Sequence, residues 1–207
     1  MEQSRAMPSL LIATKNAHKT SEIAAMLGPA WQVSDLNAHP GIPAPDETGE
    51  TFADNAAIKA LAASRLFAGL VLADDSGLEV DVLGGAPGVR SARYAGPQAT
   101  DADNRAKLLD ALAGVRTEQR SARFRCVLVL AEQGEPRATF DGAVEGEIID
   151  AERGEGGFGY DALFVPRGFR ETFAQLPATT KNTLSHRARA MEKARAFLAV
   201  GQPGSVD

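Results

Sequence analysis

The chain has 207 residues, of which 44% are hydrophobic and 24% are charged, the composition of a globular protein that fits one ordinary domain. Its net charge of −5 argues against sequence-independent binding to DNA or RNA, which depends on many cation–phosphate contacts. It contains no apolar run of about 18 residues, its residues 1–9 are polar and lack the apolar core of a signal peptide, and its single cysteine excludes an internal disulfide. We therefore expect a cytoplasmic protein that binds neither nucleic acid nor a membrane.

The first third of the chain predicts strand, helix, helix and strand. Residues 10–14 form a short apolar run, and residues 17–27 carry apolar side chains at helical spacing. Thr51 is positioned to cap a second helix over 51–67, with Asp54 as its capping-box partner. Residues 70–73 are uniformly apolar, which indicates a buried strand.

The middle of the chain is richer in glycine and in strand-forming residues. Residues 77–95 predict an irregular segment, with 78–83 as a candidate for a short strand inside it. Two β-rich segments at 123–131 and 137–149 flank a turn sequence and predict a long antiparallel hairpin. Between these regions a helix opens at Thr100 and contains Leu108, Leu109 and Leu112.

The C-terminal part predicts one more short strand at 162–165 and a final helix capped by Ser185. Because helices and strands alternate at both ends with a hairpin between them, we expect an α/β fold with a mixed sheet. We assign residues 1–200 to a single bilobed domain and 201–207 to a flexible tail. The apolar stripe of the last helix comprises Ala188, Met191, Ala194, Phe197 and Leu198.

A polar segment follows the first strand and opens the first helix, so helix N–H groups, Lys15 and Lys19 face one spot. An anion would bind there. Alternatively, Asn16 is only a helix cap and the lysines are a solvated face. The spacing is not that of a P-loop. The six candidate residues are Thr14, Lys15, Asn16, Ala17, His18 and Lys19.

Two adjacent carboxylates, Asp74 and Asp75, follow the second apolar strand and precede Ser76. Adjacent acids repel one another unless a cation lies beside them, and oxygen ligands of this kind suit Mg²⁺ with substrate phosphates. The alternative is an Asp-Ser-Gly turn whose side chains bond the local backbone. Glu47, with Asp46 before it, supplies a further acid with the same ambiguity.

A glycine-rich segment at 154–161 sets Phe158 and Tyr160, two of the chain's few aromatic rings, beside Gly159 and Asp161. Rings held on such a loop can stack on a planar base, although the loop could equally be packed onto the core.

A cationic group surrounds the start of the last helix, where His186 and Arg187 occupy the first turn and Lys181 precedes them. Cations there oppose the helix dipole, so stability alone would not select them. An exposed helix start is the alternative explanation.

Taken in order over residues 10–197, these segments resemble the inosine triphosphate pyrophosphatase family. Family members often have glycine at the positions of Lys15 and His18, so the backbone approach to phosphate differs there. The matching segments are Ile12-Ala13-Thr14 with Asn16 and Lys19, Glu47-Thr48-Gly49 with Thr51-Phe52 and Asn55-Ala56, Ala73 to Gly77, Gly84-Gly85-Ala86-Pro87-Gly88 with Ser91-Ala92-Arg93-Tyr94, Gly156 to Asp161, and Lys181 with Ser185-His186-Arg187.

The resemblance implies a long central mixed sheet flanked by helices, two lobes around a substrate cleft, and a homodimer. It implies hydrolysis of deaminated purine nucleoside triphosphates (ITP, dITP and XTP) to the monophosphate and pyrophosphate. Residues 14–19 would bind the triphosphate and Ser76 would contact the substrate. Asp75 would accept a proton and bind Mg²⁺ together with Glu47 and Asp74. The nucleoside would be enclosed by Phe158, Gly159, Tyr160, Asp161, Lys181, His186 and Arg187.

Two other functions are less consistent with these segments. A nucleotide pyrophosphatase of the septum-inhibitor (Maf) type shares an anion-binding start and acidic residues, but the segments at 158–161 and 185–187 argue against it. A nucleotide-sensing module with an inactive site is disfavoured because all three acids, Glu47, Asp74 and Asp75, are present. The sequence leaves open the ranking among ITP, dITP and XTP and the residue that excludes the guanine 2-amino group.

Overall fold

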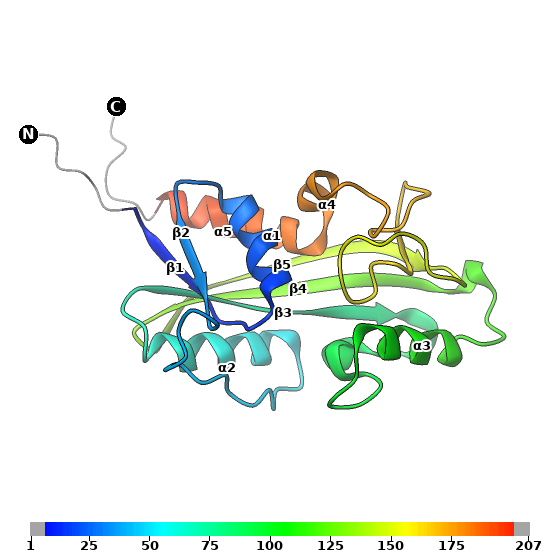
Figure 1. Cartoon of the computed structure of the whole chain (residues 1–207), viewed down its shortest axis with the longest axis horizontal. Helices are drawn as coiled ribbons and strands as arrows, with labels where there is room; N and C mark the ends of the chain where they lie inside the picture. Colours follow the sequence, from blue (N-terminus) through cyan, green and yellow to red (C-terminus); the bar gives the residue numbers. More distant parts are fainter. Residues whose placement is uncertain (1–6, 201–207) are drawn as a thin grey trace, which may run out of the picture. The chain divides into compact units, whose positions relative to one another are not determined.

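The strands predicted from apolar runs join into one mixed sheet in the computed structural model, which describes residues 7–200 (Figure 1). The strand order is β2-β1-β3-β4-β5-β6. The expected tail at 201–207 lies outside the described residues. The strands are β1 (Ser9–Ile12), β2 (Gln32–Asp35), β3 (Leu70–Val80), β4 (Ser121–Glu132), β5 (Glu135–Ile148) and β6 (Phe164–Pro166).

Parallel and antiparallel pairs both occur, which confirms the predicted α/β fold with a mixed sheet. β1 pairs in parallel with β2 and with β3, whereas β5 and β6 are antiparallel. The helices are α1 (Ala17–Leu27), α2 (Phe52–Ser64), α3 (Asp101–Ala111), α4 (Ala178–Leu184) and α5 (His186–Val200), with 3-10 turns at η1 (Asp81–Leu83), η2 (Gly88–Arg93) and η3 (Thr117–Gln119).

The four predicted helix starts are confirmed by their caps. The side chain of Asn16 accepts hydrogen bonds from two N–H groups of α1, and Ser185 Oγ accepts from Ala188 N in α5. Thr51 and Thr100 each form a complete capping box with the acid three residues later. A cap accepts hydrogen bonds from N–H groups that the helix cannot pair internally. Because only a few residue types provide such an oxygen, these positions could be predicted from the sequence.

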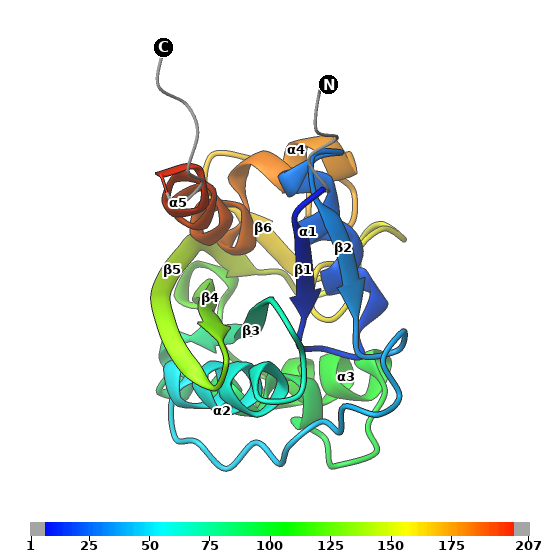
Figure 2. The same ribbon diagram turned by 90° about the vertical axis from the view of Figure 1, so that its left-hand side faces the viewer.

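The chain divides into two compact units. Within residues 7–200, the first unit comprises 7–75, 127–140 and 191–200. In it, α1 and α2 lie on opposite faces of the sheet formed around β1 and the first half of β3 (Figures 1 and 2). The buried side chains of Leu10, Leu11, Ile12, Ile23, Ala60 and Leu72 form part of its core.

The second unit comprises 76–126 and 141–190, and it is built around an aromatic core. The ring of Phe124 packs against Phe164, with centroids 4.7 Å apart, and against Phe173 at 6.0 Å. Leu108 and Leu112 are fully buried in the same cluster. This core fixes α3 and the loop at 154–161, which carries candidate site residues.

Several expected boundaries were wrong. β3 continues through the acidic segment to Val80 instead of ending at residue 73, so no Asp-Ser-Gly turn forms at Asp74. The irregular segment predicted from residue 77 starts only after Val80, and the candidate strand at 78–83 is the end of β3 as far as Val80. The second helix ends at Ser64, three residues early. Leu112 caps α3 and lies outside the helix. In α5, Phe197 is 45% exposed and does not belong to the buried stripe, although its ring contacts Phe140.

β2 and α4 were not expected. β2 has a single apolar side chain, Val33, and it forms because it pairs along β1 from Ser9 to Ile12. α4 is only seven residues long and has no side-chain cap. No helix within residues 7–200 is long and apolar enough to cross a membrane.

Candidate active site

The candidate anion-binding segment at the start of α1 is an exposed loop held by its own side chains. Asn16 N donates to Thr14 Oγ1 (3.1 Å), while Asn16 Oδ1 accepts from His18 N (2.9 Å) and Lys19 N (3.3 Å). These N–H groups are therefore taken up by the cap, as the alternative interpretation expected. Lys15, Asn16, Ala17 and His18 are exposed, whereas Lys19 turns inward.

Lys19 reaches an acid of β3 from the α1 side of the sheet. Its Nζ lies 2.5 Å from Asp74 Oδ1, and the Asp74 side chain is fully buried. Successive side chains of a strand point to opposite faces, so Asp75 is directed to the α2 face. There Lys59 Nζ lies 2.6 Å from Asp75 Oδ1 and 2.9 Å from Glu47 Oε1. Each acid of the pair thus has a lysine from a different helix.

The two lysines converge on one backbone oxygen. β1 pairs with β3 only as far as Ile12 and Leu72, and Ala13 N donates to Leu72 O. The Asp74 carbonyl points to the same edge, because carbonyls two residues apart in a strand point the same way. With β1 ended, this oxygen accepts from Lys59 Nζ (2.9 Å) and lies 3.4 Å from Lys19 Nζ.

Burial and the neighbouring charges shift the pKa values of Asp75 and Lys59. Burial by itself lowers the pKa of Lys59, but the charges of Asp75 and Glu47 outweigh it, so the pKa lies above its ordinary value. Burial raises the pKa of the Asp75 carboxyl, and Lys59 offsets this only in part. Lys59 therefore stays an ammonium, while Asp75 becomes a stronger base than an exposed aspartate.

The donor set around Asp75 fits a divalent cation. Asp75 Oδ2 is buried and has no hydrogen-bond partner among the described residues, which leaves one carboxylate oxygen available for an unmet ligand. Within residues 7–200 no three His, Cys, Asp or Glu side chains converge closely enough to hold a metal alone. Mg²⁺ is commonly held by one or two carboxylates plus substrate phosphates, and Asp75 with Glu47 supplies such a pair.

Asp74 is placed differently from the other two expected metal ligands, because its carboxylate is directed to Lys19 on the opposite face. The ligand set of Glu47, Asp74 and Asp75 therefore remains a prediction, and the geometry favours Glu47 and Asp75.

α2 positions this cluster and contributes a residue that the sequence analysis missed. Lys59 lies one turn after Asn55, so both face the buried side of the helix. Asn55 Oδ1 accepts from Gly49 N at 2.8 Å, and a Cβ on Gly49 would lie only 2.5 Å from Asp54 Cβ. Glycine thus allows the Glu47 loop to approach α2. A lysine and an asparagine on the alanine-rich face of a helix were the available signal for Lys59.

In the second unit, a buried ion pair lies under an aromatic ring. Lys181 Nζ is 2.6 Å from Asp161 Oδ2, and both side chains are buried. The same Asp161 oxygen accepts from Phe158 N at 2.9 Å, and Lys181 Nζ lies 4.8 Å from the centre of the Phe158 ring. The loop and α4 therefore meet at one charged pair, while Tyr160 of the same loop lies in the buried core, so the loop is packed onto the core as the alternative expected and also carries this charged contact.

His186 and Arg187 begin α5, as predicted, but neither is an exposed helix start. Arg187 is completely buried, and its Nη2 donates to Ser76 Oγ at 3.0 Å. Its guanidinium carbon lies 5.7 Å from the centre of the Phe158 ring. His186 stacks on Phe124 at 4.8 Å. A buried guanidinium is costly without compensating contacts, and the contacts with Ser76 and Phe158 contribute to that compensation. The structure thus brings Ser76, Phe158, Asp161, Lys181 and Arg187 together.

Tyr160 is buried and structural in its contacts, because its hydroxyl donates to Ser91 O at 2.9 Å. Burial, with the nearby charges of Tyr94 and Asp101, raises the pKa of this phenol far above its ordinary range. It therefore stays a donor at any physiological pH.

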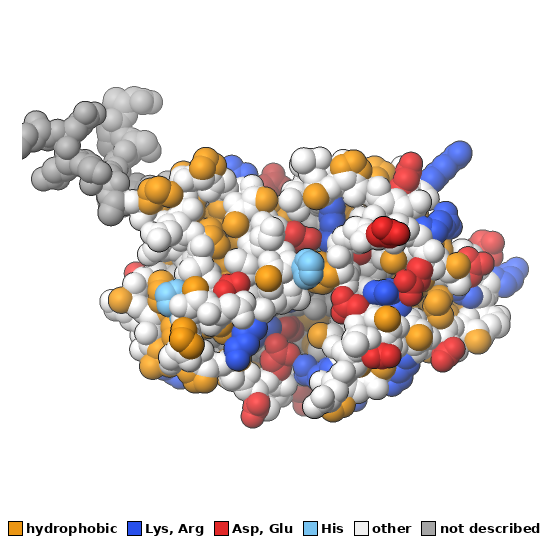
Figure 3. All heavy atoms as spheres, in the orientation of Figure 1, with side chains coloured by type: hydrophobic (Ala, Val, Ile, Leu, Met, Phe, Trp, Pro, Cys, Tyr) orange, Lys and Arg blue, Asp and Glu red, His pale blue; other side chains and the backbone are white. Residues whose placement is uncertain are grey.

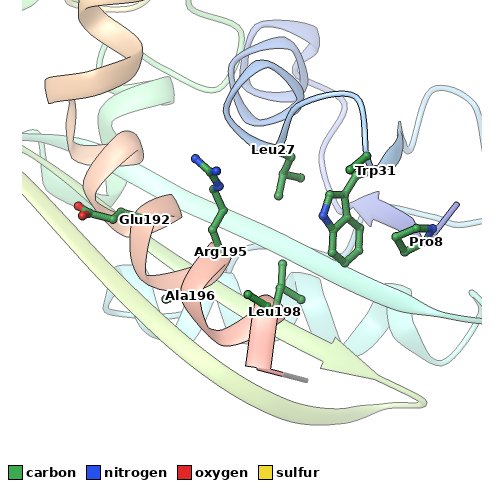
Figure 4. Close-up of a pocket in the computed structure, with 9 residues that line it drawn as sticks. Pro8, Leu27, Trp31, Glu192, Arg195, Ala196 and Leu198 are labelled. Atoms are coloured by element: carbon green, nitrogen blue, oxygen red, sulfur yellow. The ribbon is translucent and has the colours of Figure 1, made fainter. Parts of the chain in front are cut away.

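Cavities within the individual units lie away from these residues. One of about 490 Å³ is lined by Leu27, Trp31, Arg195 and Leu198 among others (Figure 4), and another of about 320 Å³ lies near Phe169. Neither contains a candidate site residue. On the face shown in Figure 3, acidic and basic side chains are interspersed.

Comparison with known proteins gives consistent matches over nearly the whole chain. The sequence profile of the Ham1 family matches residues 10–197. A dITP/XTP pyrophosphatase of Desulforamulus reducens is 50% identical over 190 residues, covering 91% of this chain and 94% of that protein. One of Geobacillus kaustophilus is 51% identical over 188 residues, covering 90% and 92%.

Solved structures agree with these matches. The Ham1 protein of Staphylococcus aureus is 38% identical, with a TM-score of 0.82, over 94% of this chain and 100% of that one. A HAM1 protein of Coxiella burnetii has the same identity and coverage and a TM-score of 0.84.

Proposed function

The chain belongs to the Ham1 family, and from this premise we propose that it is a nucleoside triphosphate pyrophosphohydrolase. It hydrolyses deaminated purine nucleoside triphosphates, namely ITP, dITP and XTP, to the monophosphate and pyrophosphate. The relatives named dITP/XTP pyrophosphatase, whose sequences are 50% and 51% identical to this chain, support this activity. The structural observation that carries the proposal is the Glu47–Lys59–Asp75 cluster, in which Lys59 and Asp75 are buried, with one Asp75 oxygen left without a partner among the described residues.

The segment from Thr14 to Lys19 is proposed to bind the triphosphate. It is exposed, it begins an 11-residue helix, and Lys15 adds a positive charge to that end. The N–H groups of His18 and Lys19 are held by Asn16, so phosphate oxygens would either replace the Asn16 contact or bind beside it. Lys19 contributes its charge from next to Asp74.

Mg²⁺ is the proposed cofactor, with Glu47 and Asp75 as its protein ligands and Asp74 as a weaker candidate. Bound there, Mg²⁺ would neutralise phosphate charge and polarise the α-phosphate. Lys59 holds the two carboxylates at one place by bonding both. It also limits their mutual repulsion before the ion binds.

Asp75 is proposed to accept the proton of the attacking water. Its raised pKa suits a general base, and its Oδ2 is not committed to another group. Lys59 orients the carboxylate through Oδ1. The water attacks the α-phosphorus, the bond to the bridging oxygen breaks, and pyrophosphate leaves.

Base recognition is proposed to fall to the second unit's cluster, with Phe158 as the stacking surface and Arg187 and His186 reading the base. Hypoxanthine and xanthine carry a 6-oxo acceptor where adenine has an amino donor. The arginine side chain has only hydrogen-bond donors, so it can pair with the 6-oxo group and not with the amino group of adenine. The contact of Arg187 with Ser76 fixes one end of its planar group.

We also propose a homodimer in which residues 1–200 act as one bilobed domain, as the family resemblance implies, and a cytoplasmic location, as the composition favours.

The deciding experiment incubates the protein with ITP, XTP, GTP and ATP in Mg²⁺ and separates the products. We expect IMP and pyrophosphate from ITP in one step, with little turnover of ATP. IDP and orthophosphate as first products would contradict the assigned scissile bond. Binding of ITP without any product would instead favour an inactive nucleotide-sensing module.

A further inference from the structure

Two charged side chains of α3 bond both polar groups of one glycine in the candidate base-binding loop. Gly159 N donates to Asp101 Oδ2 at 2.7 Å, and Arg105 Nη1 donates to Gly159 O at 2.9 Å. Asp101 and Arg105 are four residues apart, so they lie on the same face of the helix. α3 therefore binds the loop at two points of a single residue.

Neither residue takes part in the capping box of α3. The capping box uses Thr100 and Asp103, and their mutual bonds satisfy the helix start. Asp101 takes no part in this capping box, and its Oδ2 accepts the hydrogen bond from Gly159 N. Arg105 also forms an ion pair with Glu152, whose Oε1 lies 2.8 Å from Arg105 Nε in a geometry that makes no hydrogen bond. This double contact holds the guanidinium in place against Gly159.

The consequence reaches the aromatic ring through the backbone. Gly159 N belongs to the peptide group that follows Phe158, and Phe158 N belongs to the one that precedes it. The first is bonded to Asp101 and the second to Asp161, so both peptide groups around the Phe158 Cα are fixed. The direction of its Cα–Cβ bond is therefore set, because only two backbone torsions lie between those groups.

Glycine is required for this arrangement. Gly159 has φ of +60°, in the left-handed region that other residues rarely adopt. The chain can thus turn between Phe158, which faces Lys181, and Tyr160, which is bonded to Ser91.

We propose that Asp101 and Arg105 are positioning residues that hold the Phe158 ring and thereby set the selectivity for the base. The inference rests on the proposed function, because it assigns a base-stacking role to Phe158. Neither residue touches the base; both act through Gly159. An untethered loop would let the ring move, and stacking would then discriminate less among purines.

The test compares Asp101→Ala, Asp101→Asn, Arg105→Met and Arg105→Lys with the parent on ITP and ATP. Losing one charge-assisted hydrogen bond is expected to raise KM for ITP by about 10- to 100-fold in Asp101→Ala and Arg105→Met. The ratio of kcat/KM for ITP to that for ATP should fall as well. Asp101→Asn keeps an acceptor oxygen and Arg105→Lys keeps a donor, so both should recover part of the ratio.

Asp110→Ala is the matched control, since it removes an exposed acid from the same helix. We expect parental kinetics from it. Thermal unfolding of each variant separates a positioning role from a merely structural one. A merely structural role would lower the melting temperature and reduce kcat/KM for ITP and for ATP by the same factor. An unchanged ITP-to-ATP ratio in both Asp101→Ala and Arg105→Met would overturn the inference. A parent that releases no pyrophosphate from ITP would refute the proposed function and this inference with it.

Discussion

Replacing Asp75 with Asn is expected to remove most of the turnover while leaving the fold intact. The substitution keeps the shape of the side chain and removes its negative charge. It therefore removes the proton acceptor and one proposed Mg²⁺ ligand together. Loss of a general base alone costs about 10²- to 10⁴-fold in kcat, and weaker metal binding would add to that loss.

The structure predicts a small effect of the same change on stability. Lys59 would keep Glu47 Oε1 and the Asp74 carbonyl, each at 2.9 Å, so its ammonium would not be left unpaired. Burial already disfavours the ionised form of Asp75, as its raised pKa indicates. Removing that charge also removes its desolvation cost, so we expect unfolding free energies within about 1 kcal/mol of the parent.

The assay measures pyrophosphate release from ITP over a range of Mg²⁺ concentrations, with urea unfolding of the same samples. Asp46→Asn is the matched control, because it makes the same chemical change at an exposed acid beside Glu47. Activity of Asp75→Asn within about tenfold of the parent would refute the assignment and move the catalytic role to Glu47 or Asp74. Loss of folding would refute the stability argument.

Three further changes follow from the same contacts. Lys59→Met leaves the carboxylates of Asp75 and Glu47 facing each other. Without metal we expect the free energy of unfolding in urea to fall by up to about 3 kcal/mol, and Mg²⁺ should restore part of it. A fall that Mg²⁺ does not reduce would contradict the metal assignment. Arg187→Ala should lower kcat/KM for ITP far more than for ATP, by about 10²-fold or more, and an equal fall for both would make Arg187 a phosphate contact or a structural residue. Chelation should stop pyrophosphate release and added Mg²⁺ should restore it; release that persists in chelator would refute metal dependence.

The helix starts were predictable from sequence because each depends on a few adjacent residues. Asn16, Thr51, Thr100 and Ser185 all cap helices as expected. The fold class also followed from the order of elements. Local signals of this kind do not depend on contacts far along the chain.

The extension of β3 through Asp74, Asp75, Ser76 and Gly77 could not be predicted in this way. A run of polar residues with glycine has low strand preference and is typical of turns. It is a strand here because its side chains are satisfied by distant groups, including Lys19 for Asp74, Lys59 for Asp75 and Arg187 for Ser76. Tertiary contacts outweigh the local preference.

Lys59 was missed for a related reason. On sequence alone a lysine in an amphipathic helix is assigned to the solvated face, and its burial is visible only once its carboxylate partners are placed. The candidate site residues that were predicted carry recognisable patterns of adjacent acids, glycines or cations, whereas Lys59 is a single residue among alanines.

The position of the acidic cluster follows from where β1 ends. The helix begins at Ala17, so the chain must leave the sheet after Ala13. The next carbonyl of β3 along that edge, at Asp74, is thereby deprived of a strand partner inside the protein, where an unpaired oxygen is costly. Lys59 and Lys19 reach it from helices on opposite faces and bring two positive charges to the acids beside it. The end of β1 at this point thus leaves room for two positively charged side chains beside Asp74 and Asp75, near the start of α1. An extension of β1 that paired with Asp74 would displace both lysines, and the acids would then lose the counter-ions that the proposed chemistry requires.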